Sequence, residues 1–199
     1  MFKIIVAIFM ILVVAGCTVV KPHISEYRIN TTLQSNNIDK GQCSDKSLKV
    51  AKAFSSNALM SVDMNYAIGE YKSDVFTQSQ WAQTPNRAIT AQVLKMLQDS
   101  KLFKTVQIFK SRSKNGLILE TNIEEFMQYF SVEKNSSIAK VVISTTLIDA
   151  RTNTVLESKT FSKNVEVESL NAEGGVIALN AGLSEVLIKQ REWLGEVCK

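Results

Sequence analysis

Three cysteines are the residues of this chain best suited to covalent chemistry, and Cys17 has the most informative surroundings. A single cation, Lys3, precedes an apolar run from Ile4 to Val14, and small residues then lead into the cysteine. A charged start, a short apolar segment and small residues at its end are typical of a secretion signal. The run is too short to span a bilayer, which takes roughly 20 helical residues. We therefore predict that residues 1–16 are a cleaved signal peptide.

A cysteine directly after such a segment matches the lipobox of bacterial lipoproteins. The match implies that the Cys17 thiol carries a diacylglyceryl group, that cleavage follows Gly16 and that the new amine is often acylated too. Two or more acyl chains anchor a protein stably where one does not. Thr18 stands where Asp would be the usual inner-membrane retention signal, so we expect the periplasmic leaflet of the outer membrane. Residues 17–24 would then be a lipidated tether.

The other two cysteines, Cys43 and Cys198, form an even pair once the lipidated one is set aside. In an oxidising compartment such a pair is most simply a disulfide. The bond would close a loop of roughly 155 residues and stabilise the fold by ~2–5 kcal/mol. Two free thiols and an intermolecular bridge remain alternatives. Neither cysteine lies in a C-x-x-C pair, so metal binding and thioredoxin-like chemistry are poorly supported.

Catalytic candidates are sparse. The one histidine, His23, falls in the predicted tether, far in sequence from any nucleophile. Glu124 and Glu125 are adjacent carboxylates, but consecutive residues of a strand point to opposite faces. The sequence contains no phosphate-binding loop, no Rossmann glycine pattern and no metal-ligand spacing. We predict that the protein is not an enzyme and needs no cofactor or metal.

Composition argues for an ordinary globular domain outside the signal. Hydrophobic residues make up 45% and charged residues 21% of the chain, with a net charge of +4. The positive excess is spread along the chain, which argues against nucleic-acid binding. The densest basic run, Lys101 to Lys114, alternates with apolar residues and is interpreted as a solvated face. Asn135 lies in an acidic sequon in a predicted hairpin loop, and its glycosylation is left open.

Residues 25–199 are predicted to form one α/β domain, with a mixed, largely antiparallel sheet packed with two main helices. Thr84 is a plausible N-cap and Pro85 a natural first residue for a helix that runs to about Ser100. A second helix is expected from Asn171 to Val197. Strands are expected at 25–30, 47–51, 64–71, 74–78, 105–109, 117–130 with a bend or bulge, 138–149 with both faces buried, and 155–167.

From Trp81 onward, several short motifs follow one another along the chain. They are Trp81-x-x-x-Pro85, a helix carrying Leu94 and Leu97, Leu102-Phe103-x-x-Val106, a strand ending in residues 147–152 (Leu-Ile-Asp-Ala-Arg-Thr), and a C-terminal helix with Trp193. This arrangement resembles the ABC-type transport auxiliary lipoprotein family. The first sixty residues depart from it, since the polar loop with Cys43 is not expected of the family.

The resemblance implies a periplasm-facing lipoprotein that serves an ABC system of the MCE (mammalian cell entry) type, which carries lipids between the inner and outer membranes. Its partners would be the membrane, an MCE protein and the ABC permease and ATPase. Trp81, with Pro85, is the expected contact for a partner or lipid, because large aromatic residues often anchor interfaces. The alternative for Trp81 is a lid on the domain core. A bound lipid and a homo-oligomer both stay open.

Two other classes of function compete with this interpretation. The first is a structural or assembly lipoprotein that binds another cell-envelope machine, such as that for lipopolysaccharide or peptidoglycan. The second is an enzyme or a small-ligand receptor. A gene neighbourhood with a permease, an ATPase and an MCE protein would separate transport from assembly.

Overall fold

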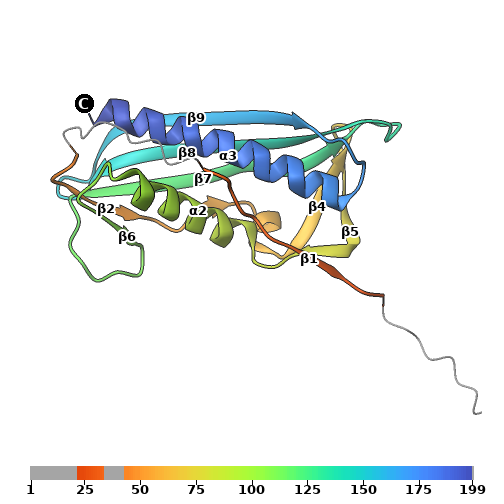
Figure 1. Ribbon diagram of the computed structural model, residues 1–199, viewed down its shortest axis with the longest axis horizontal. Coiled ribbons are helices and arrows are strands. Elements are labelled where there is room, and N and C mark those ends of the chain that lie inside the picture. The colour runs from red at the N-terminus through yellow and green to blue at the C-terminus, as the bar shows by residue number, and fades with distance from the viewer. Residues whose placement is uncertain (1–21, 34–42, 199) are drawn as a thin grey trace, which may run out of the picture.

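The three longest strands are β7 (Leu117–Phe130), β8 (Ser137–Asp149) and β9 (Thr154–Glu166). Burial alternates along β7 and β8, whereas β9 is mostly exposed. The three strands pair in order as antiparallel neighbours (Figure 1). The structure is a computed structural model and describes residues 22–33 and 43–198. Its other strands are β1 (Ser25–Tyr27), β2 (Ser47–Val50), β3 (Phe54–Ser55), β4 (Asp63–Ile68), β5 (Lys72–Trp81) and β6 (Thr105–Ile108). The helices are α2 (Pro85–Ser100), α3 (Ala172–Val197) and the short 3-10 turn η1 (Asn57–Met60).

Strand β7 is the hub of the mixed nine-stranded sheet. Along one edge it pairs with β8 over its whole length, and β9 continues beyond β8. Along the other edge it receives β2, β3 and β4 in turn, all parallel to it. Beyond these, β6 is parallel to β2, β5 is antiparallel to β4, and β1 is parallel to β5. The predicted single α/β domain with a mixed sheet and two main helices is confirmed.

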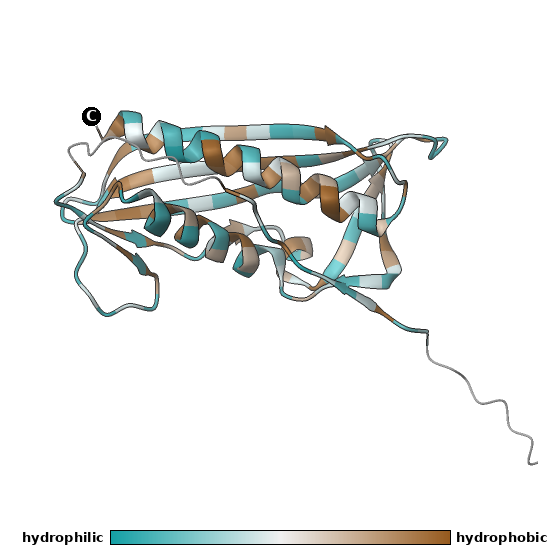
Figure 2. Cartoon of the chain, in the orientation of Figure 1, coloured by the Kyte–Doolittle hydropathy of each residue, from teal (hydrophilic) through white to brown (hydrophobic). Residues whose placement is uncertain are grey.

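Both helices cover the same face of the sheet (Figure 1). Helix α3 packs over β8 and β9, and α2 lies over β2, β6 and β7. Apolar residues recur along both helices and along the strands behind them (Figure 2). The largest fully buried side chains include Leu48, Ile89, Leu97, Leu119, Ile143, Leu183, Leu187 and Leu194. Helical and strand periodicity therefore meet in one core between the two layers.

The prediction that both faces of residues 138–149 are buried is wrong. Val141, Ile143 and Leu147 point to the helices and are at most 1% exposed. Val142 and Ile148 lie on the other face and are only half-buried. In the described chain no helix covers that face, so the β-branched residues there reflect strand propensity rather than a second core.

The helix boundaries lie within one residue of those expected, but the predicted cap of α2 behaves differently. Pro85 is its first residue, and Thr84 occupies the N-cap position. The Thr84 hydroxyl does not cap the helix, however, but donates to Asn86 Oδ1 at 2.7 Å. At α3 the Asn171 side chain does cap, accepting from the Gly174 N–H at 2.9 Å.

The strand ends differ by a few residues from those expected. The first strand stops at Tyr27 rather than residue 30, and the strand expected at 74–78 spans Lys72–Trp81. Trp81 is therefore the last residue of β5, where its N–H donates to the Val62 carbonyl at 2.7 Å. This pairing could not be read from the polar residues 77–80, because it depends on β4 as a partner.

Gly174 gives a prediction on stability. A Cβ atom there would lie 2.1 Å from the Ser169 carbonyl oxygen, which is backbone and cannot rotate away. Gly→Ala within a helix usually stabilises by up to ~1 kcal/mol, but here the clash should reverse the sign. We expect Gly174→Ala to lower the free energy of unfolding by ~1–3 kcal/mol, measured by urea denaturation. The exposed neighbour Glu173 is the control, since Glu173→Ala should change stability by less than ~0.5 kcal/mol. Equal stability of the two variants would contradict the argument.

Candidate functional site

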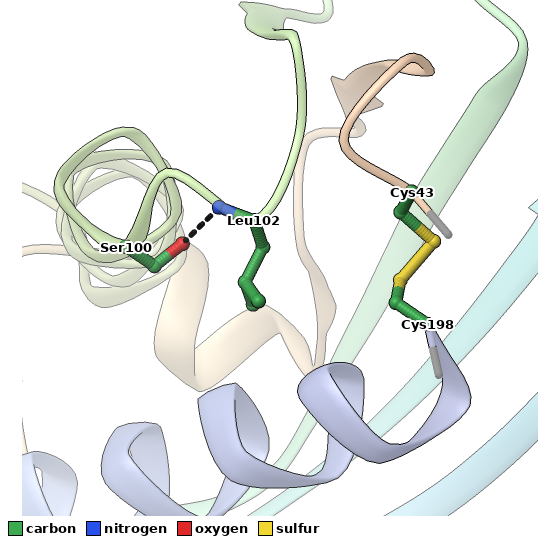
Figure 3. Close-up of a disulfide and its surroundings, with 4 residues drawn as sticks. All are labelled: Cys43, Ser100, Leu102 and Cys198. Carbon is green, nitrogen blue, oxygen red and sulfur yellow. Dashed lines mark hydrogen bonds between the residues drawn. A yellow bond between two sulfur atoms is a disulfide. The ribbon is translucent and has the colours of Figure 1, made fainter. Parts of the chain in front are cut away.

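The predicted covalent sites fall partly outside the described residues. Cys17 is one of residues 1–21, which the structure does not describe, so its lipidation stays a prediction. The other pair is described: the structure joins Cys43 to Cys198 in a disulfide, with their Cα atoms 5.2 Å apart (Figure 3). Both cysteines are buried. The bond fastens the segment before β2 to the C-terminal end of α3.

The end of helix α2 lies beside this disulfide (Figure 3). The Ser100 hydroxyl donates to the Leu97 carbonyl at 2.8 Å and accepts from the Leu102 N–H at 3.4 Å. Lys101 between them adopts a left-handed conformation, with φ of 55°, which turns the chain out of the helix. Leu102 is thereby buried, at 1% exposed. Three distant segments thus meet at one end of the core.

Trp81 belongs to the core rather than to the surface. Its side chain is only 4% exposed, and its ring lies 5.7 Å from that of Phe126 on β7. Pro85 is buried as well. The structure thus gives Trp81 the alternative role named from the sequence, a lid on the domain core. Trp81 also lines a small hollow with Phe76 and Phe126, so its contact with a partner or lipid stays a prediction.

No catalytic constellation is found in the described part of the chain. His23 is exposed and far from any candidate nucleophile in sequence. Among residues 22–33 and 43–198, no cluster of His, Cys, Asp and Glu has the composition to hold a metal ion. Within the same ranges, no helix combines the length and the hydrophobicity needed to cross a bilayer.

The expectation that Glu124 and Glu125 point to opposite faces is wrong, because the strand bulges between Ile123 and Glu125. The extra residue puts both carboxylates on the face away from the helices. There Glu124 accepts a hydrogen bond from Ser144. Glu125 accepts one from the Tyr129 hydroxyl at 2.5 Å. The two carboxylates thus have separate structural partners, and they are not arranged as an acid–base pair.

Tyr129 gives a prediction on pH. Its burial, and then its hydrogen bond to Glu125, raise the pKa of the Tyr129 hydroxyl far above the ordinary value. A raised folded-state pKa stabilises the fold below about pH 10, where free tyrosine ionises, and that stabilisation is lost as pH rises through the folded value. In an alkaline titration followed by ultraviolet absorbance, Tyr129→Phe should therefore remove the most alkaline tyrosine step. Loss of a step near the ordinary tyrosine pKa would contradict this.

A groove of about 510 Å³ lies between α2 and the chain that leaves β6. Helix α2 contributes Arg87, Thr90, Ala91 and Leu94, which share one face of the helix. The end of β6 and the residues after it contribute Ile108, Phe109 and Lys110. Lys52, between β2 and β3, and Gln83, before α2, complete the lining. Ligand pockets commonly measure about 300–1,000 Å³, so the groove has the size of a binding site.

Side-chain hydrogen bonds hold the walls of this groove in place. The Thr90 hydroxyl on α2 accepts from the Ala53 N–H at 3.0 Å, which fixes the neighbouring Lys52 beside the helix. The Lys49 ammonium donates to the Ser111 carbonyl at 3.2 Å, which ties the loop after β6 to β2. The first tie joins α2 to the segment between β2 and β3. The second lies beside the parallel pairing of β2 with β6.

Sequence reasoning missed this groove. Lys110 lies in the basic run 101–114, which the sequence predicts to be a solvated face, and Leu94 stands out in the sequence only as part of a family motif. The available signal was a pair of exposed apolar residues, Ile108 and Phe109, next to that cation. Without knowing that α2 lies beside β6, nothing in the sequence brings these residues to Arg87.

Comparisons with known proteins agree with this fold. Protein XCC0632 from Xanthomonas campestris is similar, with a TM-score of 0.77 and 17% identity, over 87% of this chain and 96% of that one. The hypothetical protein CT253 from Chlamydia trachomatis is similar at a TM-score of 0.50 and 8% identity, over 77% of this chain and 98% of that one. At such identities the likeness shows the fold alone. A search of curated protein sequences found no match.

Residues 27–188 match the family described as the ABC-type transport auxiliary lipoprotein component. The match begins at the end of β1 and ends within α3, so it takes in the groove and most of the core, while Cys198 of the disulfide lies beyond it. It also confirms the resemblance carried by the motifs from Trp81 onward. The chain therefore belongs to the ABC-type transport auxiliary lipoprotein family.

Proposed function

We propose that this protein is the non-catalytic auxiliary component of an MCE-type ABC system that moves lipids between the two membranes of the cell envelope. The observation that carries the proposal is the family match over residues 27–188. The lack of a metal cluster among the described residues is compatible with an accessory role. In this role the domain supplies a rigid surface for partners, and other subunits hydrolyse ATP.

Membrane attachment through Cys17 is the second part of the proposal. Pro22, the first described residue, follows Cys17 by five positions, and five extended residues reach about 18 Å. The domain would thus be held close to the lipid headgroups, on the periplasmic side of the outer membrane. Thr18 in place of Asp favours that membrane over the inner one.

Crosslinking in cells, followed by identification of the co-purified proteins, tests the transport role. We expect an MCE protein, a permease and an ATPase to be recovered with the chain. The Leu94→Gln variant, changed in the groove alone, shows whether partner capture depends on this surface. Recovery of lipopolysaccharide or peptidoglycan machinery in place of these subunits would contradict the proposal and favour an assembly lipoprotein.

A further inference from the structure

The groove between α2 and β6 combines an apolar floor with a positively charged border. Its floor is apolar, with Ile108 41% and Phe109 36% exposed and no element packed over them. Its cations are Lys52, Arg87 and Lys110, and no acidic residue lines it. By contrast, the hollow beside β1 includes the Glu26 carboxylate, and the one beneath the β8–β9 turn includes two aspartates.

The three cations are free to meet an anion. Among residues 22–33 and 43–198, the ion pairs involve other side chains, namely Lys140, Arg151 and Lys163 with their acidic partners. The Lys110 ammonium instead lies 5.9 Å from the centre of the Phe109 ring. Long basic side chains cover apolar surface with their methylene stems while the charged end stays in water. The positive ends thus border the apolar floor.

The floor offers a ligand almost no polar contact. The Thr90 hydroxyl, its central polar group, already donates to the Asn86 carbonyl at 2.6 Å and accepts from the Ala53 N–H. Gln83 is the other polar side chain, and it precedes the helix. The floor over Leu94 and Phe109 therefore favours an apolar part of a ligand.

We propose that this groove binds an anionic lipid, with one acyl chain along Leu94, Ile108 and Phe109 and the negative head group between the three cations. The inference rests on the proposed function, since it assigns the auxiliary protein its own contact with the transported class of molecule. Charge complementarity selects an anionic head group over a zwitterionic one, because the cations meet no compensating carboxylate in the lining.

Photo-crosslinking of the full-length lipidated protein in nanodiscs tests the site. One arm contains phosphatidylglycerol with a photoactivatable acyl chain, a second contains phosphatidylcholine with the same chain, and a third contains a photoactivatable free fatty acid. Labelled peptides are mapped by mass spectrometry. We expect the anionic lipids to label residues 87–94 and 105–110 about tenfold more than phosphatidylcholine does. A comparison of the labelling by phosphatidylglycerol with that by the fatty acid then identifies the head group that the groove binds.

Matched variants separate the groove from net charge. Arg87→Gln with Lys110→Gln should reduce this labelling by about tenfold or more. The control, Lys72→Gln with Lys189→Gln, removes the same charge from exposed positions outside the groove and should label as wild type does. Leu94→Gln should reduce labelling because it makes the apolar floor polar. Its control is Ile177→Gln, on the exposed face of α3. Thermal unfolding checks that all variants fold.

Three outcomes would overturn the inference: equal labelling by phosphatidylcholine, unchanged labelling of the Arg87 and Lys110 variant, or crosslinks from a partner protein in the groove in place of lipid. The proposed function fails separately. If the wild-type chain recovers the transporter subunits but no lipid label, only the lipid site is wrong. If it recovers no transporter subunit, the proposed function is wrong whatever the groove binds.

Discussion

Replacing Cys17 with Ser is expected to move the protein out of the outer-membrane fraction while leaving the domain folded. The physical reason is that each buried methylene of an acyl chain contributes ~0.8 kcal/mol, and the substitution removes the thiol that would carry those chains. Fractionation of cell envelopes, followed by intact-mass spectrometry, measures both the location and the acylation of the chain.

The matched control is Thr18→Ser, a change next to the anchor that keeps the cysteine. It should fractionate as the native protein does. A salt wash distinguishes the anchor from weaker contacts, because attraction between surface lysines and anionic lipids is screened by salt and acyl insertion is not. A Cys17→Ser protein that stays in the outer membrane after this wash, or a native protein without acyl groups, would contradict the anchor.

Helices and long strands were predictable because their signals are local. The strand β7 begins and ends at the residues expected from its alternation, Leu117 and Phe130. Helix α2 begins at Pro85, whose fixed backbone angle suits a first helical turn. For α3, the expected range 171–197 differs from the observed one by a single residue, because Asn171 is the N-cap. In each case the residues that decide the boundary lie within a few positions of it.

Burial and side-chain direction could not be predicted where they depend on how the helices and strands pack together. Half-buried Val142 and fully buried Val141 are the same residue type, and only the position of the helices tells them apart. The carboxylates Glu124 and Glu125 share a face because of a bulge whose exact place is set by pairing with β8. The sequence predicts Trp81 as an interface contact, but its side chain lies buried against Phe126 on another strand.

The groove shows the same limit for a functional site. Its two walls come from Arg87 on α2 and Lys110 after β6, separated in sequence by a helix end and a short strand. Each cation alone is ordinary surface. The two cations come to line one groove because β6 pairs in parallel with β2, which places the end of β6 next to the helix. A basic residue beside exposed Phe109 was the one local hint.

Removing the disulfide through Cys43→Ala and Cys198→Ala is expected to lower the melting temperature by roughly 5–20 °C. The bond joins residues 155 positions apart. Without it the unfolded chain gains the entropy that loop closure had removed, worth about 2–5 kcal/mol. The loss should be a cooperative destabilisation of the whole domain, because the linked segments meet the end of α2 at one end of a single core. Differential scanning calorimetry measures it.

Reduction of the wild-type protein provides the matched comparison, since it opens the same bond without changing a side chain. Reductant should lower the wild-type melting temperature toward that of the double variant and leave the variant unchanged. Non-reducing mass mapping should show a peptide that contains Cys43 linked to one that contains Cys198. Two freely alkylatable thiols in the native protein would refute the bond. A wild-type melting temperature indifferent to reductant, with the bond shown to open, would instead mean that the core alone holds the C-terminal end of α3 in place.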